Sequence, residues 1–252
     1  MPTESLYTRA YRIGSADSDY MSLYRPSALL EHMQLAADGD LSSMGITVSE
    51  MLAQGLGWML LTTDLTILRP ARLEEEVSLQ TWHKGNKGVM WLRDFVLSDN
   101  QENVIAEART TWALVDLQKR KLLRPTALPF EVRSHPARSL GDIPAKVSLP
   151  DSLQTWEADR FEVRYSSTDS NGHMNNAGYA DLCCDTLTTE ELETGIRRLQ
   201  ISYHREVRMQ EQVVVERSAV VDNGIWVRGM APEDRGTIFE ARLTLNEADT
   251  SR

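Results

Sequence analysis

Asp169, Asn171 and His173 stand at alternate positions in the most polar segment of the chain, and their side chains could perform acid–base chemistry. Histidine gains or loses a proton near neutral pH, an asparagine amide can hold a water or a carbonyl, and Asp169 could orient an imidazole or the loop itself. Asn175 or Asn176 could cap a following helix, whose first amides would stabilise a developing oxyanion. These residue types suit an attack on a carbonyl group.

The same composition is also typical of an ordinary turn, because Asp, Asn and Gly are common in turns. An internal repeat supplies a comparison that separates the two interpretations. Residues 64–73 match residues 200–209 at a shift of 136 (200 − 64), and Asp17 matches Asp169 at a shift of 152 (169 − 17).

In this alignment the first copy has Met21 in place of His173 and Asp19 in place of Asn171. A loop needed only for its shape could have kept similar residues in both copies. The difference favours chemistry that is present in the second copy alone.

A carboxylate, Glu206, shows the same difference between the copies. We expect Glu206 to lie in a strand and to share one face with His204 and Arg208, because side chains alternate along a strand. The first copy has Pro70 at the matching position, so that position needs no carboxylate for folding. Glu206 is therefore a further candidate for acid–base chemistry.

Each copy is predicted to fold as a strand, a loop, a helix and a meander of strands, which is an α+β arrangement. In the second copy, alternating residues at 161, 163 and 165 predict the first strand. The apolar positions of its helix are Tyr179, Leu182, Cys183 and Leu187. Later strands are expected at residues 199–207, 211–220, 225–230 and 237–245, with a hairpin turn at Asn223-Gly224. The first copy has Pro26 for a first helical turn and these apolar positions: Leu29, Leu30, Met33 and Ala37.

Five prolines between residues 125 and 150 predict a linker between the two copies. We therefore expect an N-terminal domain over residues 1–125, a linker over 126–155 and a C-terminal domain over 156–252.

Composition and charge exclude several classes of function. A net charge of −10 should repel nucleic acid and anionic membranes, and no run of 18 apolar residues predicts a membrane span. Cys183 and Cys184 are adjacent and cannot join distant segments, which favours a reducing, cytoplasmic compartment. Neither a metal-ligand spacing nor a glycine-rich phosphate loop is present, so we expect no metal and no cofactor.

The segment from Asp169 to Tyr179 resembles the Asp-x-Asn-x-His-x-Asn-Asn-x-x-Tyr motif of plant and bacterial acyl-acyl carrier protein (acyl-ACP) thioesterases. Tyr203-His204-Arg205-Glu206 resembles that family's Tyr-Arg-Arg-Glu, and the resemblance spans essentially the whole chain. It implies a tandem double hotdog, with two antiparallel sheets each wrapped around a long central helix. It also implies hydrolysis of fatty acyl-ACP thioesters to free fatty acid and holo-ACP, in fatty acid biosynthesis.

The family's catalytic set then falls on Asp169, Asn171, His173 and Glu206. Plant members have a cysteine after the glutamate; Val207 stands there in this chain, so a covalent thiol mechanism at that position is excluded. We expect direct attack by a water that Glu206 activates and Asn171 holds. His173 would position the thioester or protonate the leaving thiolate, and Asp169 would support the loop.

The resemblance also implies where the substrate binds. Asn175 and Asn176 would contact it, and the acyl chain would enter the N-terminal domain, where the run containing Trp58 and Met59 could line a tunnel. Apolar runs of this kind are more often ordinary core. The partner would be the acyl carrier protein, with candidate basic contacts at Arg69, Arg72, Arg197, Arg198, Arg205 and Arg208. Two fused hotdogs already form a pseudo-dimer, so both a monomer and a homodimer remain open.

Three alternatives use similar residues. A coenzyme A thioesterase would use much the same site. A hotdog dehydratase also pairs a histidine with a carboxylate, but its histidine usually lies in a different loop context without the Asn-Asn pair. A non-catalytic acyl-binding module would have no need for a base such as Glu206.

Overall fold

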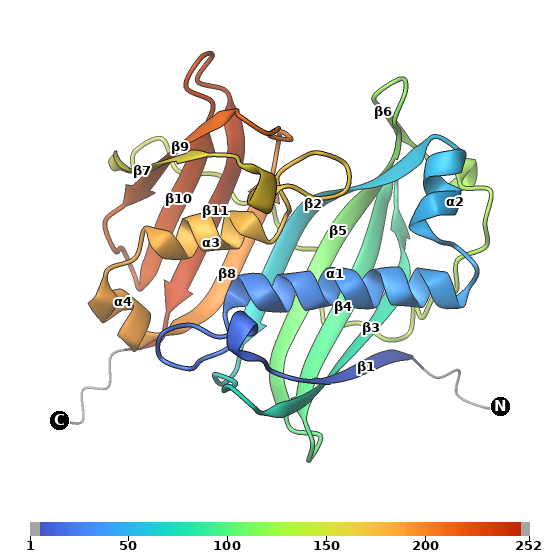
Figure 1. Cartoon of the computed structure of the whole chain (residues 1–252), viewed down its shortest axis with the longest axis horizontal. Coiled ribbons are helices and arrows are strands. Elements are labelled where there is room, and N and C mark those ends of the chain that lie inside the picture. Colours follow the sequence, from blue (N-terminus) through green and yellow to red (C-terminus); the bar gives the residue numbers. More distant parts are fainter. Residues whose placement is uncertain (1–5, 248–252) are drawn as a thin grey trace. The chain divides into compact units, whose positions relative to one another are not determined.

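The computed structural model describes residues 6–247, and the chain divides into two compact units (Figure 1). Unit 1 comprises residues 1–63 and 68–144, and unit 2 comprises residues 64–67 and 145–252. Both units are mixtures of helices and antiparallel strands, which confirms the predicted α+β class. No helix among the described residues is long and apolar enough to cross a membrane.

Unit 1 has the strand order β1-β3-β4-β5-β2, with β6 paired to β5. The long helix α1 packs on β1 and β3 of this sheet (Figure 1). The last four residues of β2 belong to unit 2. The elements are β1 (Tyr7–Arg12), η1 (Ser15–Asp17), α1 (Pro26–Ser43), α2 (Val48–Ala53), β2 (Leu56–Ile67), β3 (Glu76–Lys87), β4 (Met90–Asp99), β5 (Val104–Asp116), β6 (Lys121–Leu123) and η2 (Pro125–Ala127).

Unit 2 has the strand order β8-β11-β10-β9-β7, again antiparallel, and the helix α3 packs on β11. The elements are β7 (Thr155–Glu162), η3 (Tyr165–Ser167), α3 (Gly178–Asp185), α4 (Thr189–Thr194), β8 (Ile196–Tyr203), β9 (Gln212–Ser218), β10 (Gly224–Met230) and β11 (Thr237–Leu245).

The helix of unit 1 begins and packs as the sequence predicts. Pro26 occupies the first turn of α1, where a missing N–H removes no hydrogen bond. All four predicted apolar positions are buried: Leu29, Leu30, Met33 and Ala37.

The helix of unit 2 is shorter than predicted. α1 has 18 residues but α3 has only 8. α3 ends at Asp185, so Leu187 is buried outside the helix rather than on its face. A long central helix is therefore present in unit 1 only.

Two local predictions in unit 2 are shifted or wrong. β7 ends at Glu162, and Tyr165 lies in η3 with 86% of its surface exposed, so it is no part of an alternating strand. The hairpin between β9 and β10 exists, but its two turn residues are Asp222 and Asn223, which both have positive φ (49° and 56°). Gly224 is the flanking residue and exchanges two hydrogen bonds with Val221.

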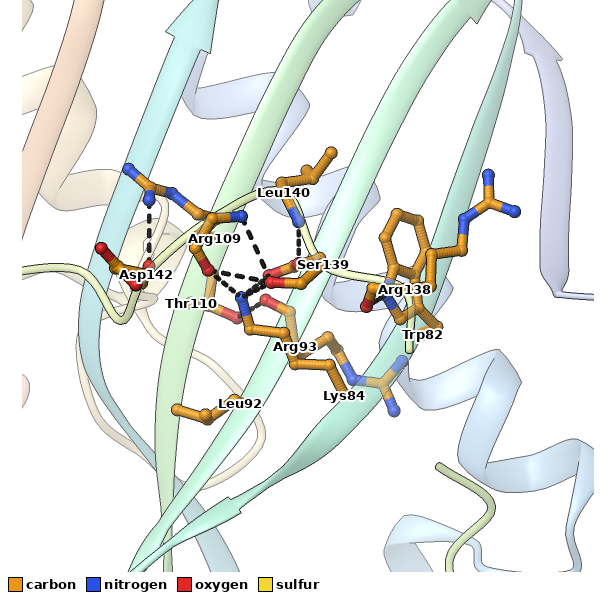
Figure 2. A network of polar contacts seen from close by, with 12 residues as sticks. Trp82, Lys84, Leu92, Arg93, Arg109, Thr110, Arg138, Ser139, Leu140 and Asp142 are labelled. Carbon is orange, nitrogen blue, oxygen red and sulfur yellow. Dashed lines mark hydrogen bonds and ion pairs between the residues drawn. The ribbon is translucent and has the colours of Figure 1, made fainter. Parts of the chain in front are cut away.

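Residues of the predicted linker form hydrogen bonds with residues of both units. Near Ser139 and Leu140 the linker crosses the face of β3, β4 and β5 that points away from α1 (Figure 2). On this face Lys84 and Asp94 form an ion pair of 3.0 Å. Lys84 Nζ also donates to Gly141 O (2.9 Å), and Asp94 Oδ2 accepts from the Leu140 N–H (2.8 Å). Further along, the Val147 N–H donates to a side chain of unit 2.

The two units repeat the same hydrogen bonds around one loop. In unit 2 the Asp169 N–H donates to His173 O (2.8 Å), and in unit 1 the Asp19 N–H donates to Leu23 O (2.8 Å). Oδ1 of each aspartate also accepts from the N–H groups two and four residues later. Asp19 is therefore the counterpart of Asp169 at a shift of 150 (169 − 19), and the predicted shift of 152 from Asp17 is wrong by two residues.

The shift falls from 150 at this loop to 136 at the following strands, so unit 2 has 14 fewer residues in between (150 − 136). Ten of these account for the difference in length between α1 and α3 (18 − 8). Most of the difference in spacing between the two copies therefore lies in the helix.

Candidate functional site

Asp169 closes the polar loop of unit 2 through both its backbone and its carboxylate. Its Oδ1 accepts hydrogen bonds from the N–H groups of Asn171 (2.8 Å) and His173 (3.2 Å). Gly172 adopts a left-handed conformation (φ 75°), which glycine reaches without a steric penalty. These bonds fix the direction in which the chain leaves the loop toward His173.

His173 and Glu206 approach each other from two separate segments. Nε2 of His173 lies 3.4 Å from Oε2 of Glu206, and the two side chains are 21% and 55% exposed. The Met174 N–H donates to Val207 O (2.7 Å), and His173 forms an isolated bridge with Arg208. Backbone bonds beside the pair therefore hold the distance between the two side chains, and the carboxylate remains open to water.

Glu206 lies in a loop rather than in a strand. Ile238 O accepts from both the His204 N–H (2.9 Å) and the Arg205 N–H (3.1 Å), which ends the regular ladder of β8. The prediction that Glu206 shares a strand face with His204 and Arg208 is wrong. Leaving the strand allows Glu206 to turn toward His173.

Asn171 is exposed at the tip of the loop. Its Nδ2 makes one long hydrogen bond of 3.4 Å to Asp169 Oδ2. The amide oxygen of Asn171 can therefore accept a hydrogen bond from a water beside the loop.

Asn175 and Asn176 do not cap α3 in the predicted way. The N-cap is Ala177, and no side chain bonds to the first turn from that position. Asn175 instead accepts from the Ala177 N–H with its Oδ1 (2.9 Å) and from the Gly178 N–H with its carbonyl (3.0 Å). The Ala177 and Gly178 amides are therefore already bonded within the turn that leads into α3. The expectation that amides at the start of this helix bind an oxyanion stays a prediction.

Aromatic residues beneath the loop form its support. Tyr179 in α3 packs edge-on against Tyr203 (5.4 Å between ring centroids) and Phe239 (5.2 Å). Burial, together with the nearby carboxylate of Glu206, raises the pKa of the Tyr179 hydroxyl. The Tyr203 hydroxyl donates to Asn176 O (3.4 Å). Tyr203 carries no signal for this role beyond its place three residues before Glu206.

The equivalent place in unit 1 keeps the loop aspartate, Asp19, but lacks the histidine, the asparagine and the glutamate. The corrected alignment puts Leu23 opposite His173 and Met21 opposite Asn171. The Tyr24 N–H donates to Ala71 O in unit 1, as the Met174 N–H donates to Val207 O in unit 2, so Ala71 and Val207 are equivalent. Pro70 therefore remains opposite Glu206. The histidine, the asparagine and the glutamate of the candidate site are therefore present in one copy only.

Other candidates lie away from this pair. Cys183 is fully buried, and burial raises its pKa, so it is a core thiol rather than a nucleophile. Among residues 6–247 no group of three or more His, Cys, Asp or Glu side chains could hold a metal ion.

Trp58 and Met59 lie in β2 of unit 1 and not in the polar loop. Trp58 packs edge-on against Trp91, with 5.0 Å between ring centroids. Because side chains alternate along a strand, Met59 points to the opposite face from Trp58.

Four of the six candidate arginines are engaged within the fold. Arg69 binds Glu75 and Asp99, Arg198 binds both carboxylate oxygens of Asp64, and Arg205 pairs with Asp234. Arg197 donates to Ile67 O. These contacts reduce the cationic surface that a partner could use.

Comparison with known proteins identifies the class that this fold and site define. The sequence profile of the acyl-ACP thioesterase N-terminal domain matches residues 4–128, and that of the acyl-ACP thioesterase C-terminal domain matches residues 151–247. The chain belongs to the acyl-ACP thioesterase family.

Curated relatives are distant in sequence. A chloroplastic acyl-[acyl-carrier-protein] hydrolase of Cuphea viscosissima is 25% identical over 95% of this chain, and 58% of that protein is covered. A chloroplastic dodecanoyl-[acyl-carrier-protein] hydrolase of Cinnamomum camphora is 25% identical over 89% of the chain, with 60% of that protein covered. The chain thus spans less than two thirds of the length of these relatives.

Solved structures share the fold. A 12:0-ACP thioesterase from Umbellularia californica matches 95% of this chain and 96% of its own, with a TM-score of 0.80 and 18% identity. An acyl-ACP thioesterase from Bacteroides thetaiotaomicron matches 95% of this chain and 97% of its own, with a TM-score of 0.77 and 19% identity.

Proposed function

We propose that the chain hydrolyses fatty acyl-ACP thioesters to free fatty acid and holo-ACP, without a covalent acyl-enzyme. Family membership supports the reaction class. The main structural support for the proposed site is the His173–Glu206 pair. Nε2 of His173 lies 3.4 Å from Oε2 of Glu206, and about half of the Glu206 side chain is exposed to water. We also propose the tandem double-hotdog arrangement, with catalysis in the C-terminal domain and acyl-chain binding in the N-terminal domain.

In this mechanism Glu206 acts as general base. It takes a proton from a water that the Asn171 amide oxygen also holds, and the resulting hydroxide attacks the thioester carbonyl. His173 stands beside Glu206, receives the proton that Glu206 took from the water and passes it to the leaving thiolate as the thioester C–S bond breaks, which returns both side chains to their starting states. Asp169 holds the loop that presents Asn171 and His173.

We propose a mechanism without an acyl-enzyme because neither Val207 nor Cys183 can act as a nucleophile. Val207 follows Glu206 and carries no nucleophile. Cys183 is buried with its pKa raised, so its thiolate is disfavoured. A water nucleophile then requires a base, which is the role assigned to Glu206.

The test is thiol release from matched acyl-ACP and acyl-CoA substrates by wild type and by Glu206→Gln. We expect release from acyl-ACP and a loss of kcat of at least about 100-fold in Glu206→Gln, because a general base contributes about 10²–10⁴ in rate. Faster thiol release from acyl-CoA than from acyl-ACP would identify an acyl-CoA thioesterase instead. Release from no thioester would support a non-catalytic acyl-binding module.

Unit 2 offers a matched control for this substitution. His204 Nε2 lies 3.1 Å from Glu240 Oε2, a second histidine–glutamate pair, and Oε1 of Glu240 accepts from the Leu149 N–H (2.8 Å) rather than from the polar loop. Glu240→Gln removes the same charge and should leave kcat within about twofold of wild type. An equal loss in both variants would show that charge removal in general, and not the site, lowers turnover.

A further inference from the structure

Two indole N–H groups in unit 1 are buried without a partner. Nε1 of Trp58, in β2, and Nε1 of Trp91, in β4, have no hydrogen-bond acceptor among the residues that the structure describes. The two rings meet edge-on, with 5.0 Å between centroids and 77° between planes. The two rings that carry these donors therefore lie in one place in the core.

The neighbouring tryptophans show that the fold normally supplies an acceptor. Trp112 packs against the same core cluster, and its Nε1 donates to Thr110 Oγ1 (2.8 Å). Trp82 donates to Arg138 O (2.9 Å). A buried donor without an acceptor lowers stability, so two of them side by side call for an acceptor from elsewhere.

The surroundings of the pair are apolar. Trp91 lies in a core cluster with five further buried residues, against which Trp58 packs: Ile46, Met51, Leu56, Leu114 and Leu128. This cluster joins α2, β2, β4 and β5. An alkyl chain would be favourable in such a place, and two N–H donors within it would select an oxygen on that chain.

The charge of the surroundings points to an uncharged oxygen. The ring of His83 lies 5.0 Å from that of Trp91, and burial lowers the pKa of His83 to about 4, so the imidazole is neutral at pH 7. The buried guanidinium of Arg93 is neutralised by Asp40, 2.9 Å away. No uncompensated cation faces the indoles from these groups, and a carboxylate would be desolvated without compensation.

We propose that the N–H groups of Trp58 and Trp91 bind a neutral oxygen on the acyl chain, so that the preferred substrates are hydroxy- or oxo-acyl thioesters. This inference rests on the proposed function, because it requires that unit 1 binds the acyl chain. It adds the class of acyl group and names the two residues that select it.

The test compares acyl-ACP thioesters of equal length that carry no substituent, or one hydroxyl or oxo group at successive positions. We expect wild type to prefer at least one oxygenated isomer in kcat/KM by about five- to tenfold, the value of one net hydrogen bond. Trp58→Phe and Trp91→Phe keep the ring but remove the N–H, and each should lower kcat/KM for the oxygenated isomer to the value that the same variant shows for the unsubstituted substrate. Trp112→Phe is the matched control and should retain the preference.

A second measurement covers the case in which a phenylalanine variant folds poorly. Equilibrium dialysis of the hydroxy acid and its parent fatty acid against Glu206→Gln should show tighter binding of the hydroxy acid by a similar factor. Equal kcat/KM for plain and oxygenated substrates, with hydrolysis intact, would overturn this inference alone. A preference that survives both phenylalanine substitutions would also overturn it, because a donor other than the two indoles would then bind the substrate oxygen. Turnover of no thioester would overturn the proposed function as well.

Discussion

His83 shows how one buried side chain links stability to pH. Its ring is 4% exposed, and Nδ1 lies 3.0 Å from Leu92 O. Burial is the first cause of a pKa lowered from 6.5 to about 4, and the positive charge of Arg93 adds to it. The folded protein therefore holds this imidazole in its neutral form.

We predict that stability falls as the pH drops from about 6.5 to 4. The unfolded chain binds a proton at its ordinary pKa of about 6.5, whereas the folded chain does not until about pH 4, so protons favour unfolding in this window. His83 should contribute a slope of about 1 kcal/mol per pH unit to the free energy of unfolding. Urea denaturation at several pH values measures the slope.

The variant His83→Asn should flatten that slope, and His204→Asn, at an exposed histidine, should keep it. A slope unchanged in His83→Asn would contradict the assignment.

At the scale of the element, the turn of the polar loop depends on one backbone conformation. Gly172 has φ 75°, and a Cβ added there would meet no atom within 4 Å. Any cost of a side chain is therefore a backbone cost and not a steric clash with neighbours. The equivalent residue of unit 1, Ser22, adopts φ 60° with a side chain, so the turn tolerates one.

We predict that Gly172→Ala lowers the free energy of unfolding by about 1 kcal/mol, because alanine is disfavoured in the left-handed region. Gly172→Asn should cost less, since asparagine adopts this region more easily. Thermal unfolding and kcat for both variants check this. A larger loss of unfolding free energy in Gly172→Asn than in Gly172→Ala would mean that contacts of the side chain, and not the backbone conformation, set the cost.

The linker segment at residues 138–142 is fastened by a buried ion pair (Figure 2). The side chains of Lys84 and Asp94 are 7% and 0% exposed, and both also bond to the segment itself. Removal of one partner leaves a buried charge alone, which typically costs about 3–5 kcal/mol.

Accordingly, Lys84→Met should lower the free energy of unfolding by about 3 kcal/mol and should speed proteolysis near Arg138. The double variant Lys84→Met/Asp94→Leu should recover part of the loss, because no unpaired charge remains. Limited proteolysis and denaturant titration measure the two effects. A double variant less stable than Lys84→Met would contradict a charge-based explanation.

At the scale of the whole molecule, the two units share the backbone of one loop but differ in the side chains that this loop presents. The loops of both units share their hydrogen bonds, yet His173 corresponds to Leu23. Unit 1 contains another histidine–carboxylate pair, His32 with Asp17 (3.5 Å). That pair lies on α1 and η1, and Oδ2 of Asp17 accepts from the Gly14 N–H (2.9 Å), so this carboxylate closes a different turn from the one that Asp169 closes.

The expected result is that His173→Leu, which gives unit 2 the residue of unit 1, leaves less than about 1% of wild-type kcat. His32→Ala should keep turnover near the wild-type level if the variant folds as judged by circular dichroism. Residual activity in His173→Leu that His32→Ala then removes would assign a second site to unit 1.

The sequence by itself determined the α+β class, the internal repeat, the family and the polar residues of the loop, because these depend on local patterns and on residue types. It placed α1 correctly, since Pro26 and an apolar face act over a few turns. Local patterns could not show that β8 ends before Glu206, because the end depends on two amides that share Ile238 O of a neighbouring strand. The approach of Glu206 to His173 is a consequence of that long-range contact.

Tertiary structure also decided the alignment of the two loops and the start of α3. The shift of 150 follows from bonds that Asp19 and Asp169 accept, not from the aspartate that looks similar in sequence. The Ala177 and Gly178 N–H groups bond to Asn175 in the turn that comes directly before α3. Asparagine side chains and turn amides have several possible partners, and only the packed chain selects one of them.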